Sequence, residues 1–176
     1  MAAEKSAGGR GESMSQNRTS MELDDDRAIV ISRTFNGPAR IVFDAWSKPE
    51  LVKRWWAPRS IGVSMVSVDA DVRVGGAYRY VLKPAGGDEF AFSGKYTEVT
   101  PHSRLAYTMV YEPQASAGEV IVTVTFEERD GKTHLVSHEL YPSKEVRDIV
   151  IETGMEKGML ITMDQLDELV ASLASG

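Results

Sequence analysis

Large apolar and aromatic side chains recur at alternate positions in three consecutive stretches of the chain. They are Tyr78, Tyr80, Phe90, Phe92, Tyr96, Tyr107, Met109 and Tyr111. Alternate side chains of a β-strand point to the same face, so each stretch should present these residues on one face of a sheet. That face is either an ordinary core or the wall of a small-molecule site, with tyrosine hydroxyls as its few convergent polar groups. We expect ligand contacts from this set.

Two adjacent tryptophans, Trp55 and Trp56, close a short predicted helix. An indole ring offers a large apolar face and one hydrogen-bond donor. The pair can therefore seal one end of the core, or it can form a gate or stacking surface at the mouth of a pocket. We include both residues among the candidate ligand contacts.

The segment from Ser143 to about Leu173 carries apolar residues at steps of three and four. They are Ile151, Met155, Met159, Met163, Leu166, Val170 and Leu173. This spacing predicts one long amphipathic helix of about 30 residues and 45 Å, with Ser143 as its N-cap. Methionines fill cores and also line adaptable hydrophobic sites, so Met155 and Met159 are further candidate contacts.

Gly154 and Gly158 lie four residues apart beside that apolar stripe. Each glycine in a helix interior costs about 1 kcal/mol relative to alanine, so its presence needs a reason. One reason is close packing of the helix backbone on a strand. The other is a helix wall kept bare above a cavity, which makes Gly158 a candidate site residue.

Charged and imidazole side chains give weaker signals. Arg33 falls on the apolar face of its predicted strand, where it would need a carboxylate such as Glu139 or an acidic ligand. His102 lies in a predicted turn, and His134 and His138 would stand about 13 Å apart along one strand, too far to share a metal ion. We find no phosphate loop, dinucleotide fingerprint or catalytic triad, and expect no metal, cofactor or catalytic residue.

The elements that must position these residues follow from the change of hydrophobic period. A strand from about Arg27 precedes two short helices, six hairpin-linked strands between Ile61 and Tyr141, and the long helix. Short links predict an antiparallel meander. The sequence therefore predicts an α+β fold in which a curved antiparallel sheet of about seven strands grips the C-terminal helix. Residues 1–26, rich in Gly, Ser, Glu and Asp, are predicted to be a disordered tail, and residues 27–174 a single domain.

Composition excludes several classes of protein. The 176 residues suit one domain, with 42% hydrophobic and 26% charged residues, as in ordinary globular proteins. The net charge of −6 argues against binding to nucleic acid or an anionic membrane. No run is long enough for a membrane span, and the absence of cysteine fits a cytoplasmic protein.

Four motifs in one order resemble the bacterial branch of the activator of heat-shock protein 90 ATPase homologue family, within the START-like (SRPBCC, birch-pollen-allergen-like) superfamily. They are Trp55-Trp56-Ala57-Pro58, Val74-Gly75-Gly76, Ser93-Gly94-Lys95-Tyr96 and Gly154-Met155-Glu156-Lys157-Gly158-Met159, followed by Leu166. The resemblance covers about Arg27 to Ser172 and implies a helix-grip fold with a deep hydrophobic cavity. It transfers no catalytic set.

Three functions are consistent with these observations. The first is binding of a small hydrophobic or amphipathic molecule, lipids included, between the sheet and the C-terminal helix. The second, suggested by the family resemblance, is a chaperone-linked interaction module that uses an exposed sheet face. The third is a polyketide cyclase or dehydratase, for which a tyrosine or Glu139 would have to serve as the acid or base. We expect the first and assign no enzyme activity.

Overall fold

One antiparallel sheet of eight strands forms the body of the computed structural model, which describes residues 18–176. In space the strands run in the order β1-β2-β8-β7-β6-β5-β4-β3. Their bounds are β1 Ser20–Asp24, β2 Ala28–Phe35, β3 Val63–Ala70, β4 Ala77–Pro84, β5 Phe90–Thr100, β6 Arg104–Tyr111, β7 Val120–Arg129 and β8 Lys132–Leu140. The α+β class and the antiparallel curved sheet are confirmed, but the sheet has one strand more than the seven predicted.

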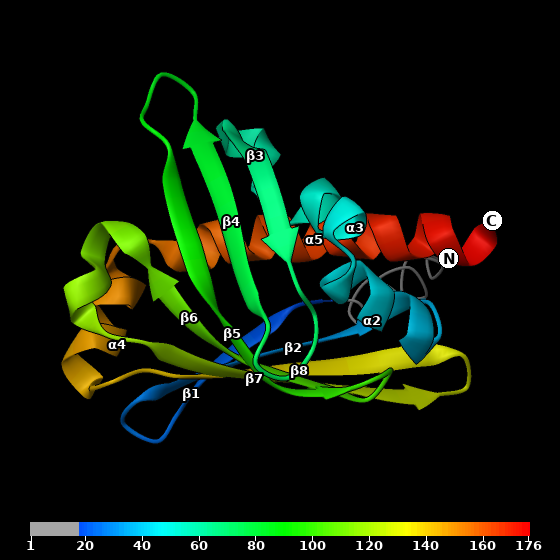
Figure 1. Cartoon of the computed structure of the whole chain (residues 1–176). Helices are drawn as coiled ribbons and strands as arrows, with labels where there is room; N and C mark the ends of the chain where they lie inside the picture. Colours follow the sequence, from blue (N-terminus) through cyan, green and yellow to red (C-terminus); the bar gives the residue numbers. More distant parts are fainter. Residues whose placement is uncertain (1–17) are drawn as a thin grey trace, which may run out of the picture.

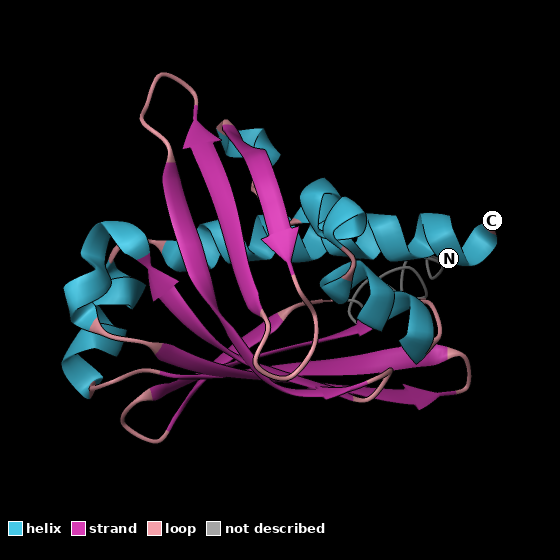
Figure 2. Cartoon of the chain, viewed as in Figure 1, coloured by secondary structure: helices cyan, strands magenta, loops and turns pink. Residues whose placement is uncertain are grey.

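Four α-helices accompany the sheet in the described residues, together with two short 3-10 turns. They are α2 Ala39–Ser47, α3 Pro49–Trp55, η1 Arg59–Ile61, η2 Glu112–Ala117, α4 Lys144–Glu152 and α5 Met155–Ser175. Figure 1 shows α5 lying across the sheet, with α2 and α3 beside its C-terminal half and α4 at the opposite end. Figure 2 shows the curvature of the sheet, with β3, β4 and β5 rising past α5 and the other strands lying below it in this view. No helix in residues 18–176 is long and apolar enough to cross a membrane.

The additional strand, β1, lies in the segment predicted to be a disordered tail. Met21 pairs with Ile31 of β2, and the ladder continues to the pair formed by Asp24 and Ala28. The prediction is therefore wrong for residues 20–24, while residues 1–17 lie outside the described range. Composition misled here because β1 is an edge strand with mostly exposed side chains, stabilised by backbone pairing rather than by apolar burial.

The predicted single C-terminal helix is two helices. Ser143 caps α4 as expected, its Oγ accepting a hydrogen bond from the amide of Val146 at 3.2 Å. The helix ends at Glu152, and Gly154 has φ 83°, in the left-handed region that glycine adopts without a steric penalty. Gly154 is thus a helix boundary and not part of a continuous stripe. The 3.6-residue period continues on both sides, so periodicity alone could not show the break.

Helix α5 is fixed to the sheet by a buried guanidinium. Arg33, 7% exposed on β2, places Nη1 2.6 Å from Oδ1 of Asp164 and Nη2 3.4 Å from Oδ2 of Asp167. The expectation that Arg33 pairs with Glu139 or an acidic ligand is therefore wrong, because α5 supplies both carboxylates. Gln165, between these two aspartates, donates from Nε2 to the carbonyl oxygens of Trp55 and Ala57 at 2.8 and 2.7 Å.

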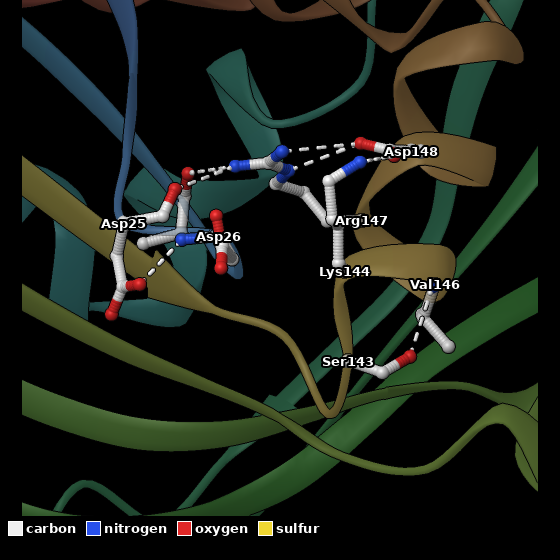
Figure 3. Close-up of polar contacts among 8 residues, drawn as sticks. Asp25, Asp26, Ser143, Lys144, Val146, Arg147 and Asp148 are labelled. Carbon is white, nitrogen blue, oxygen red and sulfur yellow. Dashed lines mark hydrogen bonds and ion pairs between the residues drawn. The ribbon is translucent and has the colours of Figure 1, made fainter.

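Helix α4 is fixed to the other end of the sheet by a second buried arginine. Figure 3 shows the guanidinium of Arg147 between Asp148 and the turn that follows β1. It donates to the carbonyl oxygens of Asp25 and Ala28 at 3.1 and 3.4 Å, and to Oδ1 of Asp148. The turn between β1 and β2 thus depends on α4, which lies more than a hundred residues later in the sequence.

Deleting β1 should lower stability. We expect a chain that lacks residues 1–25 to unfold with a free energy about 1–3 kcal/mol lower than a chain that lacks only residues 1–17, because Arg147 loses an acceptor and β2 loses its edge partner. Denaturant melts of the two truncated proteins measure the difference. Equal midpoints would show that β1 contributes nothing.

Candidate functional site

The alternating set of large residues lies on one face of the sheet, as predicted. Phe92 pairs with both Tyr80 and Tyr111, and Tyr96 pairs with Tyr107, so their side chains share a face across β4, β5 and β6. This inner face is the one toward the helices, because Trp56 at the end of α3 packs against it. The inner face therefore divides into a closed part and an open part.

Four tyrosines make up the closed part: Tyr96, which is 3% exposed, and three others. Tyr78, Tyr80 and Tyr107 are 4%, 6% and 8% exposed and belong to the hydrophobic core. Tyr78 donates from its hydroxyl to the carbonyl oxygen of Thr108 at 2.6 Å, and Tyr107 accepts from Nε1 of Trp46 at 3.4 Å. Burial raises the pKa of both hydroxyls, so these groups stay neutral. Ligand contact by Tyr78, Tyr80 and Tyr107 stays a prediction.

Four aromatic residues, Trp56, Phe90, Phe92 and Tyr111, make up the open part, which we call the open aromatic cluster. Trp56 packs edge-to-face on Phe92 with ring centroids 5.2 Å apart, and Phe92 lies 5.2 Å from Tyr111 and 6.1 Å from Phe90. All four remain partly exposed, and Tyr111 reaches 39%. Met109 on β6 is also half-buried. These rings contact one another but are not fully covered by the other residues of the described range, 18–176.

The apolar stripe of α5 shows the same division. Met163 and Leu166 are 4% and 0% exposed, whereas Met155 and Met159, on the same stripe nearer the N-terminus, are only half-buried. The helix keeps its apolar side toward the sheet throughout, because Met155 and Met159 also pack against the core. The loss of burial toward the N-terminus therefore reflects incomplete covering by the sheet and not a turn of the helix.

Trp55 and Trp56 have different environments. Trp55 is 2% exposed, stacks at 4.8 Å on Trp46 and donates from Nε1 to the carbonyl oxygen of Ala45 at 2.8 Å. It therefore seals the core, which is the structural interpretation of the pair. Trp56 alone has free ring surface next to the open aromatic cluster.

Gly158 does not touch a strand. A Cβ atom at this position would have Cγ of Pro58 at 3.8 Å, an ordinary van der Waals contact, as its only neighbour within 4 Å outside the helix among residues 18–176. Close packing of the helix backbone on a strand is thus wrong for Gly158. The glycine instead leaves the flank of α5 bare beside the segment that follows Trp56.

Glu139 is the acidic residue on the inner face of β8. It follows Leu135 and Ser137 on the same face and pairs with Ile29 of β2 and Val122 of β7, both of which are fully buried. The Tyr141 hydroxyl donates to its Oε1 at 2.8 Å. Burial raises the pKa of Glu139 to about 6, although the hydrogen bond from Tyr141 lowers it. The alternation of β8 was the available signal, but the sequence suggested Glu139 only as a partner for Arg33 or as an acid or base.

A hollow lies on the other, outer face of β4, β5 and β6. It has a volume of about 590 Å³, and its lining includes Arg79, Ser93, Lys95, Glu112 and Glu119. Arg79 donates to both carboxylate oxygens of Glu112, at 2.9 and 2.8 Å. The sequence analysis gave no signal for this hollow.

The histidines have separate neighbours. Nδ1 of His134 lies 3.2 Å from Oγ1 of Thr34, and Nε2 of His138 lies 3.7 Å from a carboxylate oxygen of Asp24. In the described part of the chain, no three histidine or acidic side chains converge on a point where a metal ion could bind.

This architecture, a curved antiparallel sheet that closes around a C-terminal helix, defines a helix-grip protein. A sequence model of the family described as "Activator of Hsp90 ATPase homolog 1-like protein" matches residues 36–171. The chain therefore belongs to this family, and the resemblance drawn from its motifs is confirmed. No curated protein matches the chain.

Solved structures share the fold. A protein from Rhodobacter sphaeroides has a TM-score of 0.81 and 23% identity, over 88% of this chain and 99% of its own. One from Nitrosomonas europaea has a TM-score of 0.77 and 24% identity, over 88% and 100%. A third, from Chromobacterium violaceum, is 27% identical with a TM-score of 0.70, over 81% and 96%.

Replacing Glu139 by Gln should stabilise the protein at neutral pH. The unfolded carboxyl titrates near 4.5 and the folded one near 6, so the contribution of Glu139 to stability is fully present below pH 4.5 and is lost as the pH rises through 6. The fall is up to about 2 kcal/mol, because one pKa unit corresponds to about 1.4 kcal/mol. The neutral amide that replaces the carboxyl group avoids this loss.

Urea melts of both proteins at pH 4 and pH 7.5 measure the effect. We expect equal stability at pH 4 and a more stable variant at pH 7.5. A variant that is less stable at pH 7.5 would show that the folded protein favours the ionised form of Glu139.

Proposed function

We propose that the protein binds a small hydrophobic or amphipathic molecule between the open aromatic cluster and the N-terminal half of α5. One observation carries this proposal: the apolar stripe of α5 and the aromatic inner face both lose burial at the same end of the molecule. Met155 and Met159 are half-buried, and so are Phe90 and Phe92 on the inner face. Folding leaves apolar surface uncovered there, and a ligand would gain about 25 cal/mol for each Å² of it removed from water.

The lining has the chemistry of a site for apolar molecules. Aromatic rings provide rigid contact surface, and methionines adapt to ligands of different shape. The bare flank at Gly158 adds no bulk beside Pro58. The acidic balance of the chain, with a net charge of −6, does not favour anionic partners.

Trp56 should report ligand binding. Among the three tryptophans, Trp46 and Trp55 are 6% and 2% exposed, whereas Trp56 has free ring surface at the proposed site. Titration with the neutral probe N-phenyl-1-naphthylamine should therefore quench tryptophan emission through energy transfer and give a saturating signal. The Trp56→Phe variant should lose most of the quenching that comes from direct contact between the probe and the indole ring. The phenylalanine ring that replaces it should still bind the probe.

Met159→Asp provides the second arm of this test. A carboxylate on the apolar stripe should lower probe affinity by about tenfold or more, because an unpaired charge would face the probe. Leu160→Asp, on an exposed neighbouring position of α5, is the matched control and should leave affinity unchanged. Equal affinity in all three proteins would contradict the proposed site.

A second candidate function, docking to a chaperone of the heat-shock protein 90 type, is favoured by the hollow on the outer face. The family description supplies the partner class, and the exposed ion pair between Arg79 and Glu112 supplies the polar contacts. Exposed pairs of this kind contribute little to stability because water screens them, so the fold should tolerate their loss.

Glu112→Arg should abolish capture by a purified chaperone of this type if the outer face is the docking surface. Glu98→Arg is the matched control, because Glu98 forms a similar exposed pair with Arg104 at 2.8 Å outside the hollow. Surface-immobilised chaperone measures binding of the three proteins. Loss of binding in both variants, or in neither, would contradict a role for this hollow.

A further inference from the structure

Glu139 is an acidic group in apolar surroundings. Its row across the inner face runs from Ile29 through Glu139 and Val122 to Tyr107, as the strand pairings show. Directly opposed side chains lie about 5 Å apart, so Ile29 and Val122 flank the carboxylate on both sides. Its side chain is nevertheless half-buried rather than buried, so a solvent-sized group can reach it.

The carboxylate of Glu139 has one hydrogen-bond donor in the described residues. Tyr141 donates to Oε1, and no other hydrogen bond and no ion pair reaches Glu139 within residues 18–176. The buried arginines are engaged elsewhere: Arg33 with Asp164 and Asp167, and Arg147 with Asp148 and two carbonyl oxygens. A carboxylate needs several donors when it leaves water, so Oε2 retains unused accepting capacity.

The groups that could compete for Oε2 do not carry a positive charge. The neighbouring titratable groups on the sheet are the hydroxyls of Tyr141 and Tyr107, and burial raises the pKa of each, so both remain neutral. On α5, the stripe that faces the sheet presents Met155, Met159 and Met163. The site therefore contains an acceptor without a cation beside it.

We propose that Glu139 anchors the head group of an amphipathic ligand, and that this head group is a hydrogen-bond donor, an ammonium or a hydroxyl. This inference rests on the proposed function and adds the class of ligand. A carboxylate or phosphate head would place a second negative charge beside Glu139 with no cation to compensate, which is strongly unfavourable. An ammonium would gain a charge-assisted hydrogen bond, and a hydroxyl a neutral-to-charged one.

The distance between the anchor and the open aromatic cluster suits a short alkyl chain. Tyr107 lies two strands from Glu139, and Tyr111 lies four residues further along β6. At about 4.8 Å between strands and 3.3 Å per residue, the two ends of the site are roughly 16 Å apart. Decyl compounds with different head groups are therefore suitable probes.

Calorimetric titration at pH 7.5 with decylamine, decanol and decanoate, each below its solubility limit or micelle concentration, tests the inference on the full chain. We expect wild type to bind decylamine most tightly and decanoate most weakly. In Glu139→Gln, decylamine affinity should fall by about tenfold, the loss of one charge-assisted contact, and the difference between head groups should shrink. Glu156→Gln is the matched control, because Glu156 is exposed on α5 and its substitution changes net charge equally.

Decanoate binding as tightly as decylamine in wild type would overturn the inference, and so would a decylamine preference that survives in Glu139→Gln. An equal loss of decylamine affinity in Glu156→Gln would also overturn it, since general surface attraction would then explain the preference. A different result identifies failure of the proposed function itself. If neither the decyl compounds nor N-phenyl-1-naphthylamine binds wild type, the hydrophobic site does not exist.

Discussion

The buried guanidinium of Arg33 fixes where α5 can lie, and the rest of the structure depends on that placement. A charge at 7% exposure must be paired, and the two carboxylates that pair with it, Asp164 and Asp167, lie three residues apart on one helix. Gln165, between them, holds the end of α3 through two carbonyl oxygens. Sheet, covering helix and the tryptophan pair are thus joined at one point, and the aromatic inner face remains open only beyond it.

The strands and most helices could be predicted because local patterns and tertiary packing agree. Two features could not be predicted, and each has a physical reason. The apolar period ignores backbone dihedrals, so it runs through Gly154 although the chain there has φ 83°. Residues 20–24 bury little, so composition marks them as tail, yet backbone pairing with β2 orders them. The hydrogen bonds between the backbones of β1 and β2 stabilise this strand, and the hydrophobic pattern of the sequence does not reveal them.

The inner face was predictable from parity, but not which part of it is open. Tyr80 and Phe92 are both aromatic and lie directly opposite each other on neighbouring strands. Tyr80 is nevertheless buried and Phe92 half-buried, because burial depends on how α3 and α5 cover the sheet. The bulge between Met65 and Ser67 also changes which residues lie on the inner face. Its one extra residue lets both Met65 and Val68 face inward, against the strict alternation of a regular strand. Trp55 and Trp56 are adjacent, yet Trp55 lies in the core and Trp56 is partly exposed. Successive side chains at the end of a helix point in directions about 100° apart.

The break at Gly154 has a consequence for how the fold can vary in length. If α4 and α5 were one straight helix, the fixed rise of about 1.5 Å per residue would set the distance between the end of the sheet and every later contact of α5. Here Arg147 holds α4 and Arg33 holds α5, and Gly154 joins them at a point where a Cβ atom would meet no neighbour within 4 Å in the described part of the chain. Insertions or deletions in the α4 segment can therefore be absorbed at the joint while α5 keeps its register on β2. The end of the molecule next to Met155 is the part whose dimensions are free to change.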